Sequence, residues 1–267
     1  MTIIGLRNGK WDEKVSLEPT HEVLTGQGVF ETILVTEQTP QFLDLHLSRL
    51  SNSSGILGIQ MPEVEEITAG VKQLLKSHQG ASGRLRITLY GGVSMQQVLL
   101  SLVEFTPWAA HVSVNISPWT RNVNSAITGA KSASYAENAL ALSWAKEMNH
   151  AETLFFNNAG QLAEAATSNI VIVVDGEAIT PPLSSGCLPG ITRRVLVEEG
   201  SMREASIDAG LLASASAAAL LSSTRGVQPV NVLDERELNP MDETLRGIAA
   251  VYETRVARDK ENWAKLQ

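Results

Sequence analysis

The chain has 267 residues, of which 43% are hydrophobic, and a formal net charge of −8. This length predicts one large or two modest domains, and the hydrophobic content excludes an intrinsically disordered chain. The negative charge argues against nucleic acid and anionic membranes as partners, because neither attracts an acidic surface.

The single cysteine, Cys187, excludes an intramolecular disulfide and a cysteine-rich metal site. The histidines show no metal-ligand spacing, so we expect no bound metal. The first 14 residues lack the apolar run of a signal peptide, and the most apolar stretch, Ala213–Leu221, is shorter than the roughly 20 residues that span a bilayer. We therefore expect a soluble cytoplasmic protein.

The first half of the chain predicts a mixture of strands and helices. A strand with a hairpin turn at Asn8-Gly9 comes first. The β-branched run Gly28–Thr36 predicts a second strand, and apolar spacing after it predicts a helix that stops at Gly58. The further predicted elements are a helix near 62–78 and two strands, 83–90 and 98–105, separated by the turn 91–92.

The second half continues the mixture after a short segment that contains a proline, 106–110, which we take as the domain linker. The predicted strands are 111–116, 152–157, 165–174, 178–180 after an Asp175-Gly176 turn, 202–207, and a strand-turn over 218–230. The predicted helices are 134–148, 191–199, 209–215 and 241–258. Without regular βαβ alternation, the pattern predicts an α+β fold with a small domain over 1–105 and a larger one over 111–267.

Two charged residues stand out in uncharged surroundings. Lys131 lies among small residues that allow a planar group to approach, and Glu164 lies between two alanines in a strand-like run. A desolvated lysine can act as a nucleophile, and a buried carboxylate needs a cation or several donors. The two residues are therefore either a buried ion pair or catalytic groups. Taken alone, the spacing around Lys131 favours a surface lysine at a loop-to-helix junction, and Glu164 alone is equally compatible with a solvated edge-strand glutamate.

Two segments suit an anion such as phosphate. LPGITRR (188–194) places Pro-Gly before a helix, whose amino end favours negative charge. SSTRG (222–226) supplies hydroxyl and N–H groups at a strand end. Either alone is compatible with an ordinary cap or turn. The GQG at 26–28 matches no phosphate-loop spacing.

Taken in order from Gly26 to Val230, these segments resemble the class IV aminotransferases, pyridoxal-phosphate enzymes of fold type IV. The resemblance implies a two-domain, D-amino-acid-aminotransferase-like α+β fold with pyridoxal 5′-phosphate between the domains. It also implies a homodimer in which the small domain of one subunit closes the site of the other. The cofactor needs a lysine, an acid and anion cradles, and the sequence offers all of these.

The resemblance assigns roles residue by residue. Lys131 matches the lysine that forms the internal aldimine and moves protons, and Glu164 matches the acid that pairs with the pyridine nitrogen. The other matches are Tyr135 for the phenolic oxygen, Leu188 for the pyridine ring, Arg49, Ile191, Thr192, Ser223 and Thr224 for the phosphate, and Phe30 for the substrate side. Arg86, or else Arg84 or Arg225, is the candidate for a substrate carboxylate. In the sequence, a core phenylalanine would look the same as Phe30, and surface arginines on a strand would look the same as these three.

The implied activity is that of 4-amino-4-deoxychorismate lyase, which forms 4-aminobenzoate and pyruvate from a small amino substrate. GAKSASYAENALAL, TPPLSSGCLPGITR and SSTRGVQPV resemble sequences of that enzyme. The segment GGVSMQQ after Tyr90 departs from the lyase pattern, which often has Arg-Gly-Tyr there. A branched-chain or D-amino-acid aminotransferase is the alternative. A cofactor-binding protein without turnover, or a structural module, also stays open.

Overall fold

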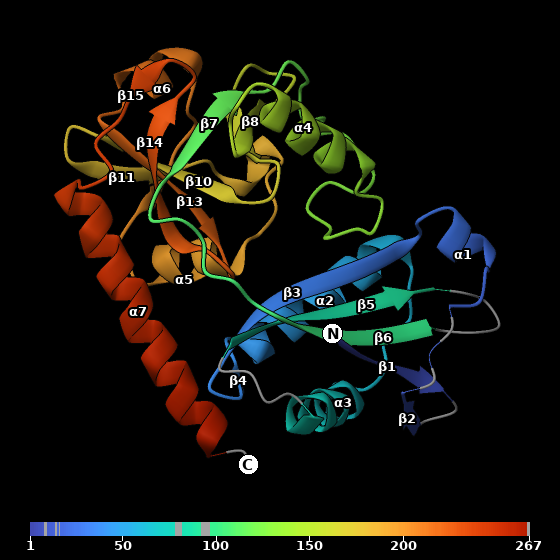
Figure 1. Cartoon of the computed structure of the whole chain (residues 1–267). Helices are drawn as coiled ribbons and strands as arrows, with labels where there is room; N and C mark the ends of the chain where they lie inside the picture. Colours follow the sequence, from blue (N-terminus) through green and yellow to red (C-terminus); the bar gives the residue numbers. More distant parts are fainter. Residues whose placement is uncertain (8–9, 14, 16, 78–81, 92–96, 266–267) are drawn as a thin grey trace. The chain divides into compact units, whose positions relative to one another are not determined.

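The computed structural model describes residues 1–7, 10–13, 15, 17–77, 82–91 and 97–265. The turn expected at Asn8-Gly9 lies outside these residues, as does Gly92. The chain divides into two compact units (Figure 1). The first unit comprises Met1–Pro107, Ala130–Ser134 and Asp259–Gln267, and the second comprises Trp108–Gly129 and Tyr135–Arg258.

The step from the first unit to the second lies within the expected linker, 106–110. Two segments from the expected larger domain nevertheless group with the first unit. Ala130–Ser134 does so because its backbone pairs with a strand there, through a bridge between Val29 and Ser132. The end of the chain does so because Trp263 packs into the first core. Long-range pairing of this kind leaves no signal in local composition.

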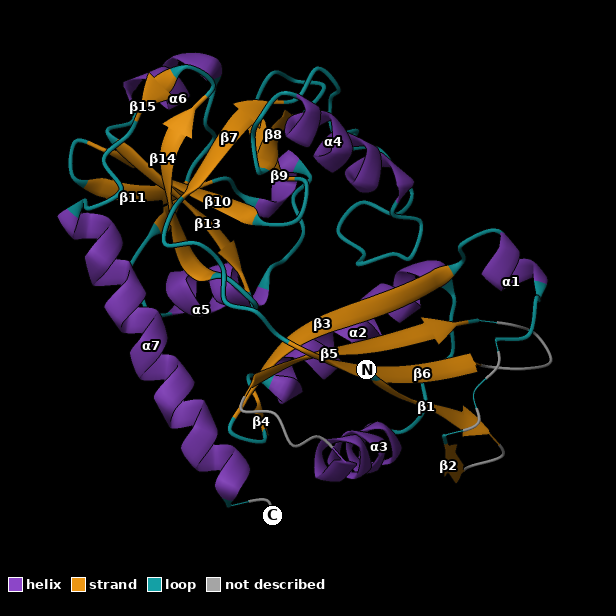
Figure 2. Cartoon of the chain, viewed as in Figure 1, coloured by secondary structure: helices purple, strands orange, loops and turns teal. Residues whose placement is uncertain are grey.

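An antiparallel sheet forms the first unit (Figure 2), with the described strands in the order β2-β1-β6-β5-β3-β4. Its strands are β1 (Thr2–Arg7), β2 (Lys10–Asp12), β3 (Gly28–Thr36), β4 (Thr39–Pro40), β5 (Ser82–Tyr90) and β6 (Gln97–Glu104). Its helices are α1 (His21–Leu24), α2 (Leu43–Leu57) and α3 (Val64–Ser77).

The core of the first unit lies between the sheet and helices α2 and α3. Alternate residues of β3, among them Val29 and Ile33, face this core, as the two-residue period of a strand requires. Leu50 of α2 and Leu74 of α3 pack against them. The prediction of a strand over Gly28–Thr36 is confirmed with the same bounds. The predicted helix stop is also confirmed, because Gly58 caps α2 in the left-handed conformation with φ 66°.

The second unit is built on a mixed sheet whose described strands run β12-β11-β10-β13-β14-β7-β8-β9, with β15 beside β14. The strands are β7 (Val112–Ile116), β8 (Glu152–Phe156), β9 (Leu162–Ala165), β10 (Asn169–Val174), β11 (Glu177–Thr180), β12 (Arg203–Glu204), β13 (Ala217–Ser222), β14 (Gly226–Leu233) and β15 (Arg236–Glu237). The helices are α4 (Ala136–Glu147), the 3-10 turn η1 (Leu183–Ser185), α5 (Ile191–Glu198), α6 (Ala209–Ser214) and α7 (Glu243–Ala264), of which the part from Asp259 onward belongs to the first unit. No helix in the described ranges is both long and apolar enough to cross a membrane.

Local signals predicted several elements of the second unit correctly and two incorrectly. The Asp175-Gly176 turn is confirmed, with φ 52° and 80° at its two residues. A single strand over 165–174 is wrong, because a turn closed by Ala165 N–H donating to the carbonyl of Ser168 separates β9 from β10. The prediction of a strand over 202–207 is also wrong. Strand pairing in this segment is limited to the two residues of β12, which run parallel to β11.

Candidate active site

Lys131 lies on an extended segment of the first unit whose backbone pairs with β3. Phe30 donates its N–H to the carbonyl of Lys131 at 2.9 Å, and Ala133 donates its N–H to the carbonyl of Gly28 at 2.7 Å. The N–H of Lys131 donates to Ser53 Oγ on α2 at 3.1 Å. The backbone of Lys131 is therefore fixed from a strand and from a helix. Such support suits a residue that must present its amine in one place.

The ring of Phe30 brings three predicted residues together. Phe30 points away from the core-facing side of β3, and Lys131 Nζ lies 4.6 Å from its ring centroid. Arg86 Cζ lies 3.7 Å from the same centroid, and Arg86 Nε donates to Thr88 Oγ1 at 3.2 Å. Lys131 and Arg86 therefore place two positive charges beside the apolar ring of Phe30. Arg84, the alternative to Arg86, is exposed on β5.

Arg49 lies on α2 in a buried cluster with two polar partners, Glu31 and His46. Glu31 accepts from Arg49 Nε at 2.8 Å and from Arg49 Nη2 at 2.7 Å, the two-point geometry typical of a strong pair. Glu31 Oε2 also lies 2.7 Å from His46 Nδ1. Burial alone would raise the pKa of Glu31, but Arg49 and His46 hold it well below its usual range. Burial lowers the pKa of His46 despite the attraction of Glu31. Glu31 thus holds the Arg49 guanidinium in one orientation.

We expect Glu31→Gln to destabilise the protein strongly. The substitution leaves the buried guanidinium of Arg49 without its counter-charge, which costs about 3–5 kcal/mol. Because the pKa of folded Glu31 is depressed, its stabilisation is full above the ordinary glutamate pKa of about 4.3 and is lost as the pH falls below it. Urea unfolding at pH 7 and pH 3 should therefore show a smaller difference between variant and wild type at pH 3.

The control for this prediction is Glu37→Gln, since the Glu37 side chain is 81% exposed and pairs with Lys260 at 3.5 Å. An exposed pair of this kind contributes about 0–1 kcal/mol. Equal stability losses for the two variants, or a loss for Glu31→Gln that does not depend on pH, would contradict the role given to Glu31.

Glu164 and Leu188, both predicted site residues, are in contact in the second unit. Glu164 lies on β9 with its side chain 12% exposed, and its Oε2 accepts from the N–H of Leu188 at 2.9 Å. Its Oε1 lies 3.4 Å from Arg121 Nη2. A carboxylate with a cation and an N–H donor beside it is favoured in its ionised form. Arg121 is therefore a cation beside Glu164 within the second unit.

The amino end of α5 has the features of an anion site. Its N-cap is Gly190, which supplies no side-chain hydrogen bond to the first turn. A Cβ at Gly190 would lie 1.8 Å from Asn169 Oδ1, so any other residue there would displace the Asn169 side chain. The two predicted residues Ile191 and Thr192 open the helix and are buried, and Thr192 Oγ1 donates to Tyr252 Oη at 3.4 Å. The N–H groups of this first turn, which no N-cap side chain satisfies, can bind a phosphate.

Ser223 and Thr224 occupy the turn between β13 and β14, as the sequence predicted. Arg225 follows them, and its side chain is 5% exposed. Its guanidinium lies 3.8 Å from the ring of Trp108 and 3.5 Å from Glu152 Oε2. Burial raises the pKa of Glu152 and lowers the pKa of Arg225. These contacts give Arg225 a structural position in the second unit.

Tyr135 immediately precedes α4. Its hydroxyl donates to the carbonyl of Ala166 at 3.1 Å, and Asn138 Nδ2 donates to the same carbonyl at 2.6 Å. Ala166 directly follows β9, the strand that carries Glu164. Tyr135 is therefore tied to the strand of the predicted acid.

Three functional candidates were missed from sequence. Glu31 left a signal, because it is an acid at a core-facing position between Val29 and Ile33 of a strand. Arg121 left none, since it lies in the irregular segment 117–129. Glu152 opens β8 and is fully buried, where Arg225 lies near it and Thr153 and Thr167 donate to it.

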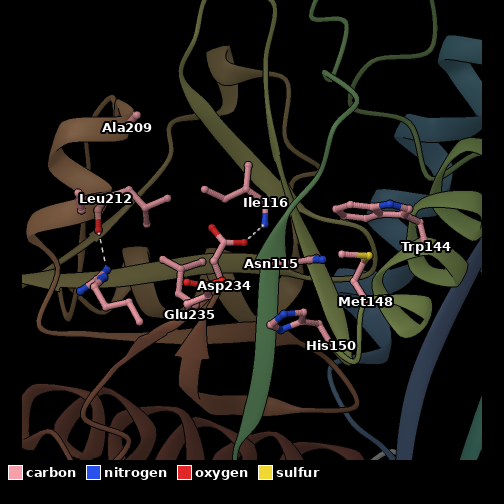
Figure 3. Close-up of a pocket in the computed structure, with 12 residues that line it drawn as sticks. Asn115, Ile116, Trp144, Met148, His150, Ala209, Leu212, Asp234 and Glu235 are labelled. Carbon is pink, nitrogen blue, oxygen red and sulfur yellow. Dashed lines mark hydrogen bonds between the residues drawn. The ribbon is translucent and has the colours of Figure 1, made fainter.

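A separate pocket of about 580 Å³ lies in the second unit (Figure 3). None of the predicted site residues lines it. Its charged groups serve the fold: Asp234 Oδ1 accepts from the N–H of Ile116 at 3.0 Å, and Arg236 donates to the carbonyl of Leu212 at 3.0 Å. We therefore do not place the active site there.

Comparison with known proteins gives consistent matches. The family model described as amino-transferase class IV matches residues 28–233. A branched-chain-amino-acid aminotransferase of Pseudomonas aeruginosa is 29% identical over 211 residues, covering 70% of this chain and 68% of the relative. An aminodeoxychorismate lyase of Bacillus subtilis is 28% identical over 209 residues, covering 72% of this chain and 71% of the relative. A solved structure, a hypothetical aminotransferase from Mycobacterium tuberculosis in its PLP-bound form, has a TM-score of 0.81 at 20% identity and covers 97% of this chain and 100% of that chain.

The matched region contains every residue that the resemblance singled out, from Phe30 to Arg225. The expected α+β architecture of fold type IV is confirmed by the structural match and by the two mixed helix-and-strand units. The chain therefore belongs to the class IV aminotransferase family and is an enzyme of that class.

Proposed function

We propose that the chain binds pyridoxal 5′-phosphate. The described side chains fit this group, because the second unit offers an almost buried carboxylate, Glu164, and a helix amino end that no side chain caps. The fixed backbone of Lys131 in the first unit supports covalent attachment through its amine. The residues proposed to hold the remaining parts of the cofactor are Tyr135, Leu188, Ile191, Thr192, Ser223, Thr224 and Arg49.

The proposed division of labour follows from the chemistry of each side chain. When bound, the cofactor supplies a ring that withdraws electrons from the carbon next to the substrate amine. Lys131 Nζ takes and returns the proton at that carbon, as general base and then general acid. Glu164 holds a proton at the ring nitrogen through its negative charge. Phe30 forms an apolar wall, and Arg86 binds a substrate carboxylate through paired donors.

We propose that the chain catalyses the reaction of 4-amino-4-deoxychorismate lyase, whose products are 4-aminobenzoate and pyruvate. The observation that carries the proposal is the placement of Lys131 Nζ and the Arg86 guanidinium over one ring, Phe30. That arrangement suits a substrate with an amine, a carboxylate and a flat apolar body. The match to the Bacillus subtilis lyase supports it.

An amino-acid aminotransferase is the second candidate, either branched-chain or D-amino acid. The match to the Pseudomonas aeruginosa enzyme favours the branched-chain form. We further propose that the enzyme is a cytoplasmic homodimer acting on a small-molecule substrate. Its mass in light scattering should then be twice the chain mass of 28.7 kDa.

A product assay separates the two reactions. Cofactor-loaded protein is mixed with aminodeoxychorismate, and 4-aminobenzoate and pyruvate are quantified. In parallel it is mixed with leucine or D-alanine and 2-oxoglutarate, and the new 2-oxo acid is quantified. We expect equal amounts of 4-aminobenzoate and pyruvate in the first assay. Rapid 2-oxo acid formation in the second assay, with no 4-aminobenzoate in the first, would replace the lyase by the aminotransferase.

A further inference from the structure

Arg121 is a nearly buried cation between two carboxylates. Its Nη1 donates to Glu137 Oε2 at 2.5 Å, and its Nη2 lies 3.4 Å from Glu164 Oε1. Its guanidinium also lies 4.2 Å from the ring centroid of Phe155. The Arg121 side chain is 13% exposed, and its Nε and Nη2 are buried without a hydrogen-bond partner among the described residues. The interaction with Glu164 is therefore one of charge rather than a closed hydrogen bond.

The backbone of Arg121 is fixed as firmly as its side chain. Its N–H donates to the carbonyl of Phe156 at 2.8 Å, and a bridge joins it to Asn157, so the residue follows the end of β8. Glu164, on the neighbouring strand β9, pairs with Phe155 of β8. Phe155 thus lies beneath the guanidinium and beside the acid, which limits the movement of Arg121 relative to Glu164.

The two carboxylates that Arg121 contacts differ in environment. The side chain of Glu137 is 54% exposed, whereas that of Glu164 is 12% exposed. Water screens the exposed pair, so that pair contributes little. The charge of Arg121 acts more strongly on Glu164, because less water lies around that pair.

We propose that Arg121 is a positioning residue that keeps Glu164 ionised and oriented toward the ring nitrogen of the cofactor. This inference rests on the proposed function, in which Glu164 pairs with that nitrogen. A proton shared between a ring nitrogen and a carboxylate stays on nitrogen when the carboxylate anion is stabilised. Arg121 Nη2 lies 3.4 Å from Glu164 Oε1, and a cation at that distance favours the carboxylate anion. The proton is thereby kept on the ring.

The test compares wild type with Arg121→Met, Arg121→Gln and Glu137→Gln after loading with 15N-labelled pyridoxal phosphate. The ring-nitrogen chemical shift reports whether the proton lies on nitrogen. We expect a protonated ring nitrogen in wild type and Glu137→Gln, and a shift toward the unprotonated form in both Arg121 variants. Turnover of the Arg121 variants should fall by about 10- to 100-fold, the range found when a group that orients ligands at metal sites is lost.

Both Arg121 variants are neutral, but Arg121→Gln keeps N–H groups that can donate to Glu137. It therefore tests the loss of the positive charge even if Arg121→Met fails to fold. A role limited to joining segment 117–129 to α4 predicts that Glu137→Gln and the Arg121 variants lose similar thermal stability and keep a protonated ring nitrogen. That result overturns the positioning role alone. Failure of the wild type to bind the cofactor overturns this role together with the proposed function.

Discussion

Lys131→Ala should abolish both covalent attachment of the cofactor and turnover. The substitution removes the only amine that we assign to attachment and to proton transfer, and loss of a general base alone costs up to about 10⁴-fold in rate. The fold should survive, because the Lys131 side chain is only partly buried and its backbone hydrogen bonds to β3 and α2 do not need it. The measurements are the visible absorption of the bound cofactor and the rate of 4-aminobenzoate formation.

Lys146→Ala is the matched control, since Lys146 is an exposed lysine on α4. It should keep the absorption band and the rate of wild type. Circular dichroism of both variants checks that the fold is retained. An unchanged band or rate in Lys131→Ala would contradict the role of Lys131, however well the cofactor binds.

Glu164→Gln should retain the cofactor and lose turnover by about 10²- to 10³-fold, a loss typical of removing one group that stabilises developing charge. Glutamine has the same shape, and its amide oxygen can still accept from the N–H of Leu188. It has no charge to hold a proton at the ring nitrogen, and it leaves Arg121 without an anion on that side. Steady-state rates with saturating cofactor measure the effect.

The control for this substitution is Glu147→Gln at the exposed end of α4, which should leave the rate unchanged. Near-normal turnover in Glu164→Gln would show that the acid is a structural residue. Loss of cofactor binding instead of rate would indicate that Glu164 holds the ring mainly by contact.

Local sequence signals predicted those elements whose causes are local. The strand Gly28–Thr36 has its predicted bounds because β-branched residues alternate along it. Gly58 ends α2, and the Asp175-Gly176 turn joins β10 to β11. Both features need a left-handed backbone conformation, which glycine adopts without steric cost. The opening of α5 at Ile191 follows from the Pro-Gly before it.

Features that depend on distant partners were not predictable in this way. The break between β9 and β10 is set partly by Thr167, whose hydroxyl donates to Glu152 on a neighbouring strand. The grouping of Ala130–Ser134 with the first unit depends on pairing with β3. Arg121 has no periodic pattern around it, and its importance appears only when its distance to Glu164 is known.

The resemblance to the class IV family supplied what local patterns do not. From spacing alone, Lys131 and Glu164 were compatible with an ion pair. The structure gives each its own surroundings: Phe30 and the backbone of β3 for the lysine, Leu188 and Arg121 for the acid. We propose separate roles for these two residues toward the cofactor, and a substrate role for Arg86.

Chemical trapping of the cofactor tests the central claim most directly. Cofactor-loaded protein is reduced with borohydride, digested and analysed by mass spectrometry, so that any lysine joined to pyridoxal phosphate carries a permanent label. We predict the label on the peptide that contains Lys131 and its absence from Lys131→Ala. A label on another lysine, or no label at saturating cofactor, would contradict the assignment of Lys131 as the residue that binds the cofactor.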